Sequence, residues 1–291
     1  MSRRLLSLAL AVTTALAGLT LTRTAAAATA VPSDPTVTAA AAAVRVMPLG
    51  DSITGSPGCW RALLFNRLVS SGHAGIDFVG TLPGQGCGVA YDGNNEGHGG
   101  YLATDVANQN QLPGWLAATR PDVVMMHFGT NDVWNNRSPA TILAAFGRLV
   151  DQMRAGKPTM RILVAKIIPM NPSGCADCAQ RVINLNNAIP GWAAGKSTSA
   201  SPITVVDQWS GFSTGSDTGD GVHPNSRGNQ KISDRWYAAL APLIPGTGTG
   251  GGTAPNGYPY CVNGAASDPD GDGWGWENSA SCVVRGGPAD R

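Results

Sequence analysis

The chain contains 291 residues with 20 basic and 19 acidic side chains, so its formal net charge is +1 and only 13% of its residues are charged. So few charges exclude the basic surface that binding to nucleic acid or to anionic lipid requires. The length suits one large domain and one small one, and we expect a monomer.

The first thirty residues have the pattern of an export signal. Arg3 and Arg4 precede an apolar run over 5–21, and Ala28-Thr29-Ala30 resembles a cleavage site. The run has neither the length nor the flanks of a membrane span. We therefore expect residues 1–30 to be removed and the protein to be secreted to the extracellular space. Removal takes away three arginines and no acids, which leaves 17 basic and 19 acidic residues and a charge of about −2.

Short apolar runs alternate with helical patterns after an alanine-rich segment at 31–43, which we expect to be disordered. In chain order the sequence predicts a strand at 44–49, a helix at 60–69, a strand at 76–79, a helix at 102–118 interrupted by Pro113, a strand at 123–128, a helix at 142–153, a strand at 162–168, a helix at 182–192 that Pro190 kinks or ends, a strand at 203–206 and a helix at 230–240. This alternation predicts an α/β fold with a flavodoxin-like, doubly wound parallel sheet. Ligands of such sheets bind beyond the carboxyl ends of the strands.

The composition changes after the predicted α/β domain, which we place at 44–245. Residues 246–256 begin with Gly-Thr-Gly-Thr-Gly-Gly-Gly, which is typical of a flexible linker. The last segment, 257–291, holds two cysteines and two tryptophans. We expect it to form a small β module stapled by a disulfide.

Six cysteines in an exported chain indicate disulfides. Their grouping in the sequence suggests three pairs, although six cysteines allow 15 connectivities. The pairs are Cys59–Cys87, Cys175–Cys178 and Cys261–Cys282. The Cys-Ala-Asp-Cys spacing at 175–178 also fits half a zinc site or a redox pair, but a second such pair is absent and the flanking residues are typical of a loop. A small structural loop is the favoured interpretation.

Three polar motifs follow the first, third and fifth predicted strands, and the ends of parallel strands meet at one edge of a sheet. Ser52 follows the first strand on a glycine-containing turn, Gly129-Thr130-Asn131-Asp132 follows the third, and Asp220 and His223 follow the fifth. Serine needs a base to take its proton. His223 is the best placed histidine, since a carboxylate three residues earlier can reach its ring and orient it.

The sequence blocks resemble those of SGNH (GDSL-type) hydrolases. Gly50-Asp51-Ser52-Ile53 is similar to block I of that family, and the segments at 96–101, 129–132 and 220–224 are similar to blocks II, III and V. The resemblance extends over about 44–243. It implies the SGNH hydrolase fold, with the nucleophile, the base and the orienting acid in blocks I and V.

The resemblance also implies a role for each site residue. Ser52 would be the nucleophile, His223 the general base and then acid, and Asp220 its orienting partner. The oxyanion hole would consist of the backbone N–H groups of Ser52 and Gly100 and the side-chain amide of Asn131. Such donors stabilise charge that develops only in the transition state, by about 3 kcal/mol each.

Further segments resemble carbohydrate esterase family 3, which contains acetyl xylan esterases. These segments are Met47–Ser52, Ile76–Gly80 and Glu96–His98. We therefore expect a secreted serine esterase that deacetylates a plant polysaccharide such as acetylated xylan through an acyl-enzyme, without a cofactor. A broad-specificity short-chain carboxylesterase or lipase is the alternative within this mechanism. Alternatives of other classes are a metal-dependent phosphoesterase and a non-catalytic polysaccharide-binding protein.

The C-terminal tail resembles carbohydrate-binding module family 10, whose members bind cellulose. The resemblance rests on Tyr258–Cys261 and on the run from Asp270 to Cys282. Trp274 and Trp276 are two residues apart, so in a strand they face the same side and can stack on sugar rings. Tyr260 is a weaker candidate for the same role. The alternative is that both tryptophans form the core of the module.

The acidic run Asp268-Pro-Asp270-Gly-Asp272 also resembles the start of a calcium loop. The acid that closes such a loop is absent, because Ser279 stands at that position. We therefore predict no metal site, with calcium binding by the tail as the less favoured alternative.

Several aromatic residues near the motifs have open roles. His98 is expected either to contact substrate or to support the loop around it, and Trp134 either to line a sugar site or to close the core. His127 lies within a predicted buried strand and is expected to be a core residue. His73 is expected to be solvated in a turn.

Overall fold

The structure is a computed structural model that describes residues 42–245, 253–261, 267–277 and 280–291. The predicted export signal, nearly all of the alanine-rich segment and the glycine run of the linker lie outside these ranges. The strands are β1 (Val44–Gly50), β2 (Ile76–Phe78), β3 (Glu96–Gly97), β4 (Val123–His127), β5 (Arg161–Lys166), β6 (Ile203–Asp207), β7 (Trp274–Glu277) and β8 (Ala280–Val283). The helices are α1 (Ser52–Gly55), α2 (Trp60–Ser70), α3 (Ala103–Asn108), α4 (Leu112–Thr119), α5 (Thr130–Trp134), α6 (Pro139–Gly156), α7 (Cys178–Lys196), α8 (Thr214–Asp217) and α9 (Ser226–Leu240), with a 3₁₀ turn at Ala241–Leu243.

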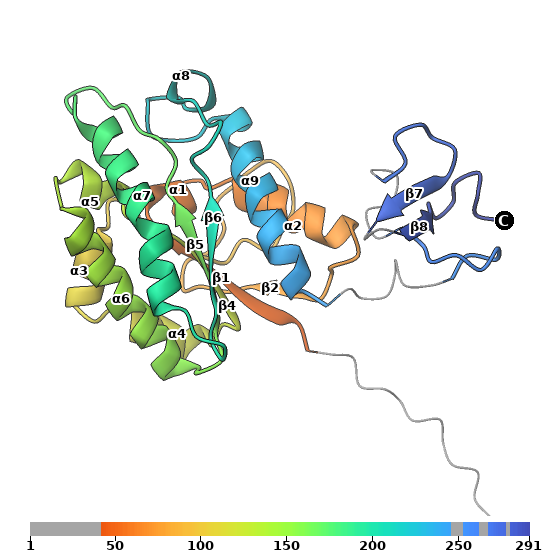
Figure 1. Ribbon diagram of the computed structural model, residues 1–291, viewed down its shortest axis with the longest axis horizontal. Coiled ribbons are helices and arrows are strands. Elements are labelled where there is room, and N and C mark those ends of the chain that lie inside the picture. Colours follow the sequence, from red (N-terminus) through yellow and green to blue (C-terminus); the bar gives the residue numbers. More distant parts are fainter. Residues whose placement is uncertain (1–41, 246–252, 262–266, 278–279) are drawn as a thin grey trace, which may run out of the picture. The chain divides into compact units, whose positions relative to one another are not determined.

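Five parallel strands form the main sheet in the order β2-β1-β4-β5-β6, which confirms the predicted α/β class (Figure 1). All five residues of β4 are buried, as expected of a strand covered on both faces. The short strand β3 pairs in parallel with the end of β1, with Glu96 opposite Leu49 and Gly97 opposite Gly50. The sequence did not predict β3, because two residues carry no periodicity.

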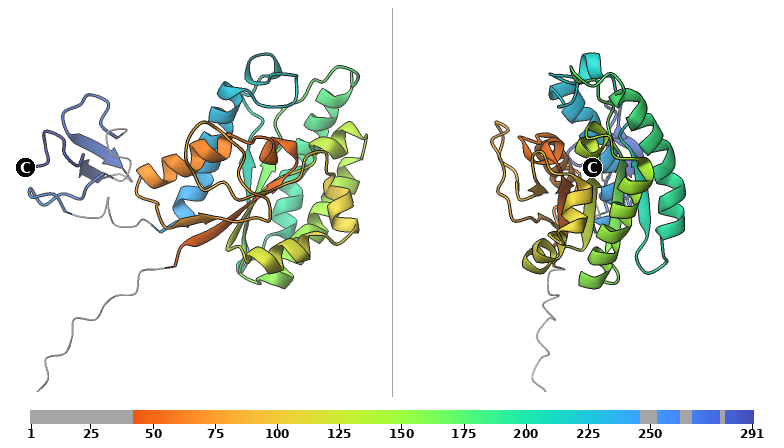
Figure 2. Two further views of the ribbon diagram at one scale, coloured as in Figure 1. Left: turned by 180° about the vertical axis from the view of Figure 1, so that it is seen from behind. Right: turned by 90° about the vertical axis from the view of Figure 1, so that its left-hand side faces the viewer.

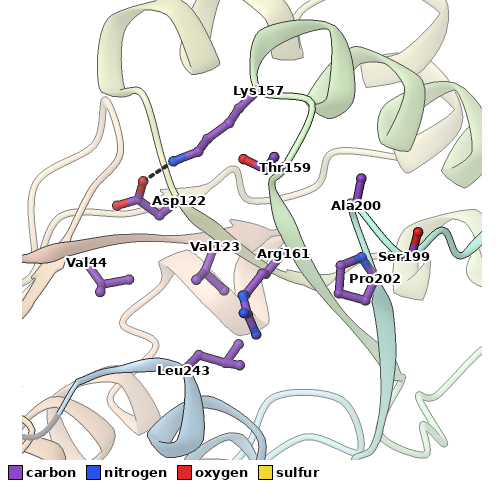
Figure 3. Close-up of a pocket in the computed structure, with 10 residues that line it drawn as sticks. All are labelled: Val44, Asp122, Val123, Lys157, Thr159, Arg161, Ser199, Ala200, Pro202 and Leu243. Carbon is purple, nitrogen blue, oxygen red and sulfur yellow. Dashed lines mark hydrogen bonds and ion pairs between the residues drawn. The ribbon is translucent and has the colours of Figure 1, made fainter.

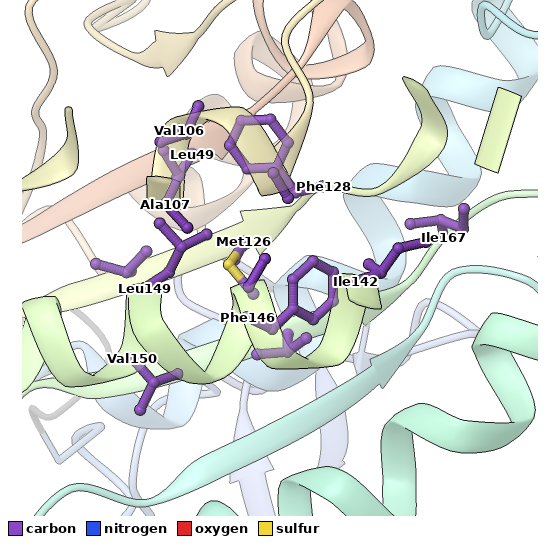
Figure 4. Packing of buried hydrophobic residues seen from close by; sticks show 14 of the residues in the cluster. Leu49, Val106, Ala107, Met126, Phe128, Ile142, Phe146, Leu149, Val150 and Ile167 are labelled. Carbon is purple, nitrogen blue, oxygen red and sulfur yellow. The ribbon is translucent and has the colours of Figure 1, made fainter. Parts of the chain in front are cut away.

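Helices cover both faces of the sheet, as Figure 2 shows. One face packs against α3, α4, α6 and α7, and its core includes Met126, Phe128, Phe146 and Leu149 (Figure 4). The other face packs against α2 and α9 around Trp60 and Trp236. Across the described ranges, no helix combines the length and the apolar character needed to cross a bilayer.

Two predicted helices differ from the observed ones. The helix expected over 102–118 is two helices, α3 and α4, because Asn110 takes a left-handed conformation between them and Pro113 lies in the first turn of the second. Pro190 lies inside α7 and does not end it. The helix continues to Lys196, since Ile189 and Ala193 remain buried on its inner side and offset the lost backbone hydrogen bond.

The segment between β2 and β3 is a long loop whose two ends lie together. Leu82 and Asn95 exchange backbone hydrogen bonds of 3.0 Å in each direction. At Gly80 a side chain would collide with the backbone of Asn95, so the chain ends approach as closely as glycine allows. The disulfide Cys59–Cys87 ties the outer part of the loop to the start of α2.

The structure contains the three disulfides suggested by the grouping of the cysteines, namely Cys59–Cys87, Cys175–Cys178 and Cys261–Cys282. In the tail, β7 and β8 form an antiparallel pair, and Cys261, Cys282 and Val284 make a small core. A side chain at Gly275 would lie 2.6 Å from the Cys261 sulfur, so the strand passes this disulfide only with glycine there.

The predicted linker extended to residue 256, but the folded tail begins earlier. Thr253 forms a β-bridge with Pro259, and Ala254 is buried. The backbone N–H of Ala254 donates to the carbonyl of Tyr258 at 2.8 Å. Residues 253–256 are therefore part of the tail's own hydrogen-bonded turn.

Candidate active site

Ser52, His223 and Asp220 form a continuous hydrogen-bonded relay at the carboxyl end of the sheet. Ser52 Oγ lies 2.9 Å from His223 Nε2, and His223 Nδ1 lies 2.7 Å from Asp220 Oδ2. These are the distances at which a base takes a proton from a hydroxyl and a carboxylate orients that base. Ser52 is the first residue of α1, directly after β1, and Asp51 caps this helix by accepting the N–H of Ile53 at 3.0 Å.

Asp220 is held in its ionised form by the turn that carries it. Partial burial opposes the charge, but hydrogen bonds from the His223 side chain and from the backbone N–H groups of His223 and Val222 outweigh it. Together they lower the pKa of Asp220 to about 2. A carboxylate that stays charged can stabilise an imidazolium formed during serine attack.

The turn from Asp220 to His223 requires a glycine at its second position. Gly221 has a φ of +83°, and a side chain there would collide with the carbonyl oxygen of Asn171. The backbone N–H of Asn171 in turn donates to the Gly221 carbonyl at 2.8 Å. The loop after β5 therefore supports the turn that carries the predicted base.

Sequence reasoning missed Asp217, which anchors the same turn from the other side. Its side chain is fully buried and forms ion pairs with Lys231 at 2.6 Å and Arg227 at 3.1 Å, both on α9. Its carbonyl accepts the N–H of Asn225 at 3.0 Å. This buried carboxylate, paired with two cations, therefore anchors the chain segment that leads to His223 onto α9. The sequence does not indicate this role, because the cationic partners of Asp217 lie ten or more residues away along the chain.

Gly100 and Asn131 belong to two segments that are hydrogen-bonded to each other, and the glycine segment passes beside Ser52. Gly100 has a φ of +80°, and no atom lies within 4 Å of the position that a side chain would take. The corresponding position on Gly99 lies 3.9 Å from Ser52 Cβ, so this turn passes next to the serine. Asn131 Nδ2 donates to the carbonyl of Tyr101 at 3.0 Å, which leaves its second N–H free of that bond.

Asp132 joins the two segments that carry these donors, and sequence reasoning did not assign it a role. Its fully buried carboxylate accepts the backbone N–H groups of Ala103 at 2.8 Å and Thr104 at 3.1 Å. These groups belong to the first turn of α3, which directly follows the glycine pair. Asp132 thereby holds the block II turn against α5.

His98 supports this turn. Its side chain is largely buried, and its Nε2 lies 2.6 Å from Glu96 Oε1. Glu96 has no exposed surface, and its carboxylate also accepts the N–H and the hydroxyl of Thr81 at 2.8 and 2.7 Å. Of the two roles left open by the sequence, the geometry therefore favours loop support.

Two further acid–base groups near the sheet end are fully buried. Burial raises the pKa of Asp51 to about 6, against the opposing effects of the Ile53 N–H and the Thr130 hydroxyl. Burial lowers the pKa of His127 to about 4, so that histidine is a neutral core residue as the sequence predicts. His73, expected to be solvated, is instead bound through Nδ1 to the carbonyl of Ile244 at 3.0 Å.

The predicted catalytic residues lie on an open surface. The side chains of His223 and Asp220 are 43% and 56% exposed, and Trp134 is also exposed, so it does not close the core. A cavity of about 390 Å³ lies at the opposite, amino-terminal end of the sheet and is lined by Asp122 and Arg161 among others (Figure 3). None of the three predicted triad residues lines it or the neighbouring cavity of about 870 Å³.

Within the described ranges, the one group of three or more potential metal ligands is Asp268, Asp270 and Asp272 in the tail. The Asp268 carboxylate already accepts the backbone N–H groups of Gly271, Asp272 and Gly273 at 2.8 to 3.1 Å. It shapes the turn before β7. The ligand set that a two-metal phosphoesterase would need is not assembled around Ser52 in the described part of the chain.

The tail presents aromatic rings on one side. Trp274 and Trp276 are both exposed, the latter by 68%, and the buried Gly275 lies between them. Neither ring therefore forms the core. Tyr258, which the sequence did not single out, lies edge-on to Trp274 with ring centroids 4.8 Å apart and is also exposed. Tyr260 is instead engaged inside the module, since its hydroxyl donates to Asp290 at 2.5 Å and Arg285 covers its ring.

Two family models match the chain. The model of the GDSL-like Lipase/Acylhydrolase family matches residues 49–231. The model of a cellulose or protein binding domain matches residues 251–284.

Solved structures with a similar fold include two esterases. A crystal structure of an acetyl esterase mutant with an acetate ion is 36% identical and has a TM-score of 0.64, with 69% of this chain and 98% of that chain covered. A carbohydrate esterase family 3 protein from Talaromyces cellulolyticus is 35% identical and has a TM-score of 0.63, with the same coverage.

A similar curated relative is a multidomain esterase from Ruminococcus flavefaciens, 28% identical over an alignment of 245 residues that covers 77% of this chain and 32% of that relative. The chain spans about a third or less of the length of the curated relatives that it matches.

Proposed function

Because the chain belongs to the GDSL-like lipase/acylhydrolase family and is an esterase similar to carbohydrate esterase family 3, we propose that it removes acetyl groups from a plant polysaccharide, acetylated xylan. The observation that carries this proposal is the relay from Ser52 through His223 to Asp220 at the open carboxyl end of the sheet. An open site admits an ester that projects from a long chain.

The reaction begins when Ser52 Oγ attacks the acetyl carbonyl and its proton passes to His223 Nε2. The backbone N–H groups of Ser52 and Gly100 and the amide of Asn131 hold the negative oxygen of the tetrahedral intermediate. The C–O bond to the sugar then breaks, and the sugar oxygen takes the proton from His223. This leaves acetyl-Ser52.

Water completes the cycle by the same route. It attacks acetyl-Ser52 while His223 takes its proton, and collapse of the second intermediate returns the proton to Ser52 and releases acetate. Asp220 stays ionised throughout, and its charge stabilises the imidazolium in both halves. The cycle needs no cofactor.

The aromatic side chains of the tail are further support for the proposal that the substrate is a polysaccharide. Its exposed Trp274, Trp276 and Tyr258 offer aromatic faces on which pyranose rings stack. Residues 44–245 would be the hydrolase domain and the glycine-rich segment a tether. Tethering to cellulose or a related polysaccharide raises the concentration of ester groups around the hydrolase domain. Three disulfides fit an extracellular protein, and we assign residues 1–30 to its export.

The test is acetate release from acetylated xylan by the wild-type protein beside Ser52→Ala. We expect release by the wild type and none by the variant. Ser210→Ala is a matched control, because Ser210 is an exposed serine outside the relay.

Two other results separate the alternatives. Cleavage of p-nitrophenyl acetate without release from xylan keeps the serine mechanism and leaves a broad-specificity short-chain carboxylesterase. Equal activity of Ser52→Ala and the wild type on both substrates would refute the serine mechanism.

A further inference from the structure

A column of three stacked rings ends beside the proposed oxyanion hole. The imidazole of His98 lies 4.3 Å from the ring of Trp115 and 4.8 Å from that of Tyr101, with interplanar angles of 15° and 22°. Two rings cannot share one face of an imidazole, so His98 lies between the other two. Trp115 packs against the core from α4, which makes Tyr101 the outer end of the column.

The column is fixed in place by hydrogen bonds at its centre. The buried Glu96 carboxylate accepts from His98 Nε2. The backbone N–H of His98 donates to the carbonyl of Gly50 at 2.9 Å, and that of Tyr101 donates to the carbonyl of His98 at 3.1 Å. Tyr101 is nevertheless 40% exposed. Since His98 covers one face of its ring, the exposed surface belongs to the opposite face and the edge.

The backbone of the residue that carries the exposed ring is joined to both proposed oxyanion donors. Tyr101 directly follows Gly100, and its carbonyl accepts the Asn131 amide at 3.0 Å. When these donors hold the carbonyl oxygen of an ester, the alcohol part of that ester therefore comes close to the ring. In an acetylated polysaccharide, that part is the sugar unit that bears the ester.

We propose that the outer face of Tyr101 is the subsite for the pyranose ring that carries the scissile ester. The apolar face of a pyranose stacks on an aromatic ring, and a ring already held by its neighbours loses little freedom on binding. This subsite rests on the proposed function, because a sugar ester must be the substrate for a pyranose to reach it. Stacking on Tyr101 would make this open site bind sugar esters more tightly than esters without a pyranose ring.

The test compares kcat/KM on soluble acetylated xylo-oligosaccharides with kcat/KM on p-nitrophenyl acetate, which has no pyranose. In Tyr101→Ala we expect the ratio of the two to fall about tenfold, mainly through a higher KM for the oligosaccharide. Tyr101→Phe keeps the ring and is expected to keep the ratio. Turnover of p-nitrophenyl acetate by each variant reports that the site is still assembled.

Three outcomes overturn the proposal. An equal loss on both substrates in Tyr101→Ala assigns the ring only to holding the turn in place through its stacking on His98. Unchanged kcat/KM on both substrates in Tyr101→Ala, with active wild type, removes the subsite but leaves the proposed function. A lower ratio in Trp134→Ala with none in Tyr101→Ala places the sugar on the other exposed ring near Asn131. The proposed function fails instead if the wild type cleaves p-nitrophenyl acetate but no oligosaccharide ester, and the subsite fails with it.

Discussion

The carboxylate of Glu96, which has no exposed surface, lies 2.6 Å from His98 Nε2. Glu96 also pairs with Leu49 in the parallel register of β1 and β3. The pair therefore connects β1, which ends two residues before Ser52, with the turn that carries Gly100. Any movement of the turn that separated His98 from Glu96 would leave a buried carboxylate without its partner, which is strongly destabilising. This contact therefore holds the turn in one position.

Replacing Glu96 with glutamine should lower kcat while KM changes little. The amide weakens the bond to His98, the turn shifts, and the Gly100 N–H moves away from the position proposed for the oxyanion. A misplacement of this kind costs about 10- to 100-fold in rate. The measurement is steady-state kinetics on p-nitrophenyl acetate. Asp234→Asn, an exposed carboxylate on α9, is the control. A higher KM with normal kcat would show that His98 contacts substrate instead.

Replacing Asp51 with asparagine should stabilise the protein at pH 8. The folded pKa of about 6 lies above the unfolded value of about 3.9. The stabilising contribution of this group is therefore complete below about pH 4 and is lost as the pH rises through 6. Asparagine can keep the cap on Ile53 without the buried charge, so we expect up to about 3 kcal/mol more free energy of unfolding at pH 8.

Urea unfolding of both proteins at pH 4, 6 and 8 checks this expectation for Asp51. The difference between variant and wild type should grow with pH. A difference that is the same at all three values would mean that Asp51 does not titrate in this range in the folded protein.

Replacing Gly221 with alanine should damage both stability and turnover. The left-handed φ and the collision with the Asn171 carbonyl would cost about 1–3 kcal/mol. Movement of the turn would also lengthen the bond between Asp220 and His223 and lower kcat. Gly191→Ala is the matched control, because Gly191 lies inside α7 with open space around it, where alanine favours the helix. Thermal melting and kcat of both variants are the measurements, and normal values for Gly221→Ala would refute the strain.

Replacing Trp276 with alanine should weaken retention on cellulose about tenfold or more. This ring is the most exposed aromatic of the described tail and loses its stacking face. The measurement is depletion of protein from solution by insoluble cellulose, with p-nitrophenyl acetate turnover as the reference for intact enzyme. Trp209→Ala, an exposed tryptophan outside the tail, is the control. Unchanged retention in Trp276→Ala would assign the aromatic side another role, such as binding protein.

The sequence predicted those parts of the molecule whose structure is determined by residues close together in the chain. The continuous apolar run of β4 and the position of Ser52 directly after β1 are both visible in the sequence, and so is the reach of Asp220 to a histidine three residues on. Each depends only on neighbours in the chain.

The supporting residues were not predictable for the opposite reason. Glu96 gains its role from Thr81 and a two-residue strand, and Asp217 gains its role from cations on α9. In the tail, the choice between Tyr258 and Tyr260 depends on which ring Arg285 covers. Such pairings are set by tertiary packing, which one sequence does not display.

The loop between β2 and β3 begins and ends at the Leu82–Asn95 bridge, and the pairing of β3 with β1 fixes the position of the glycine turn after it. Apart from Cys87, which is bonded to Cys59, and Gly93, whose carbonyl accepts from the Arg61 guanidinium, the loop can therefore change its composition without displacing the serine or the turn opposite it. For protein engineering, its exposed residues 83–86 are a place at which to insert a new segment while the reaction centre stays unaltered.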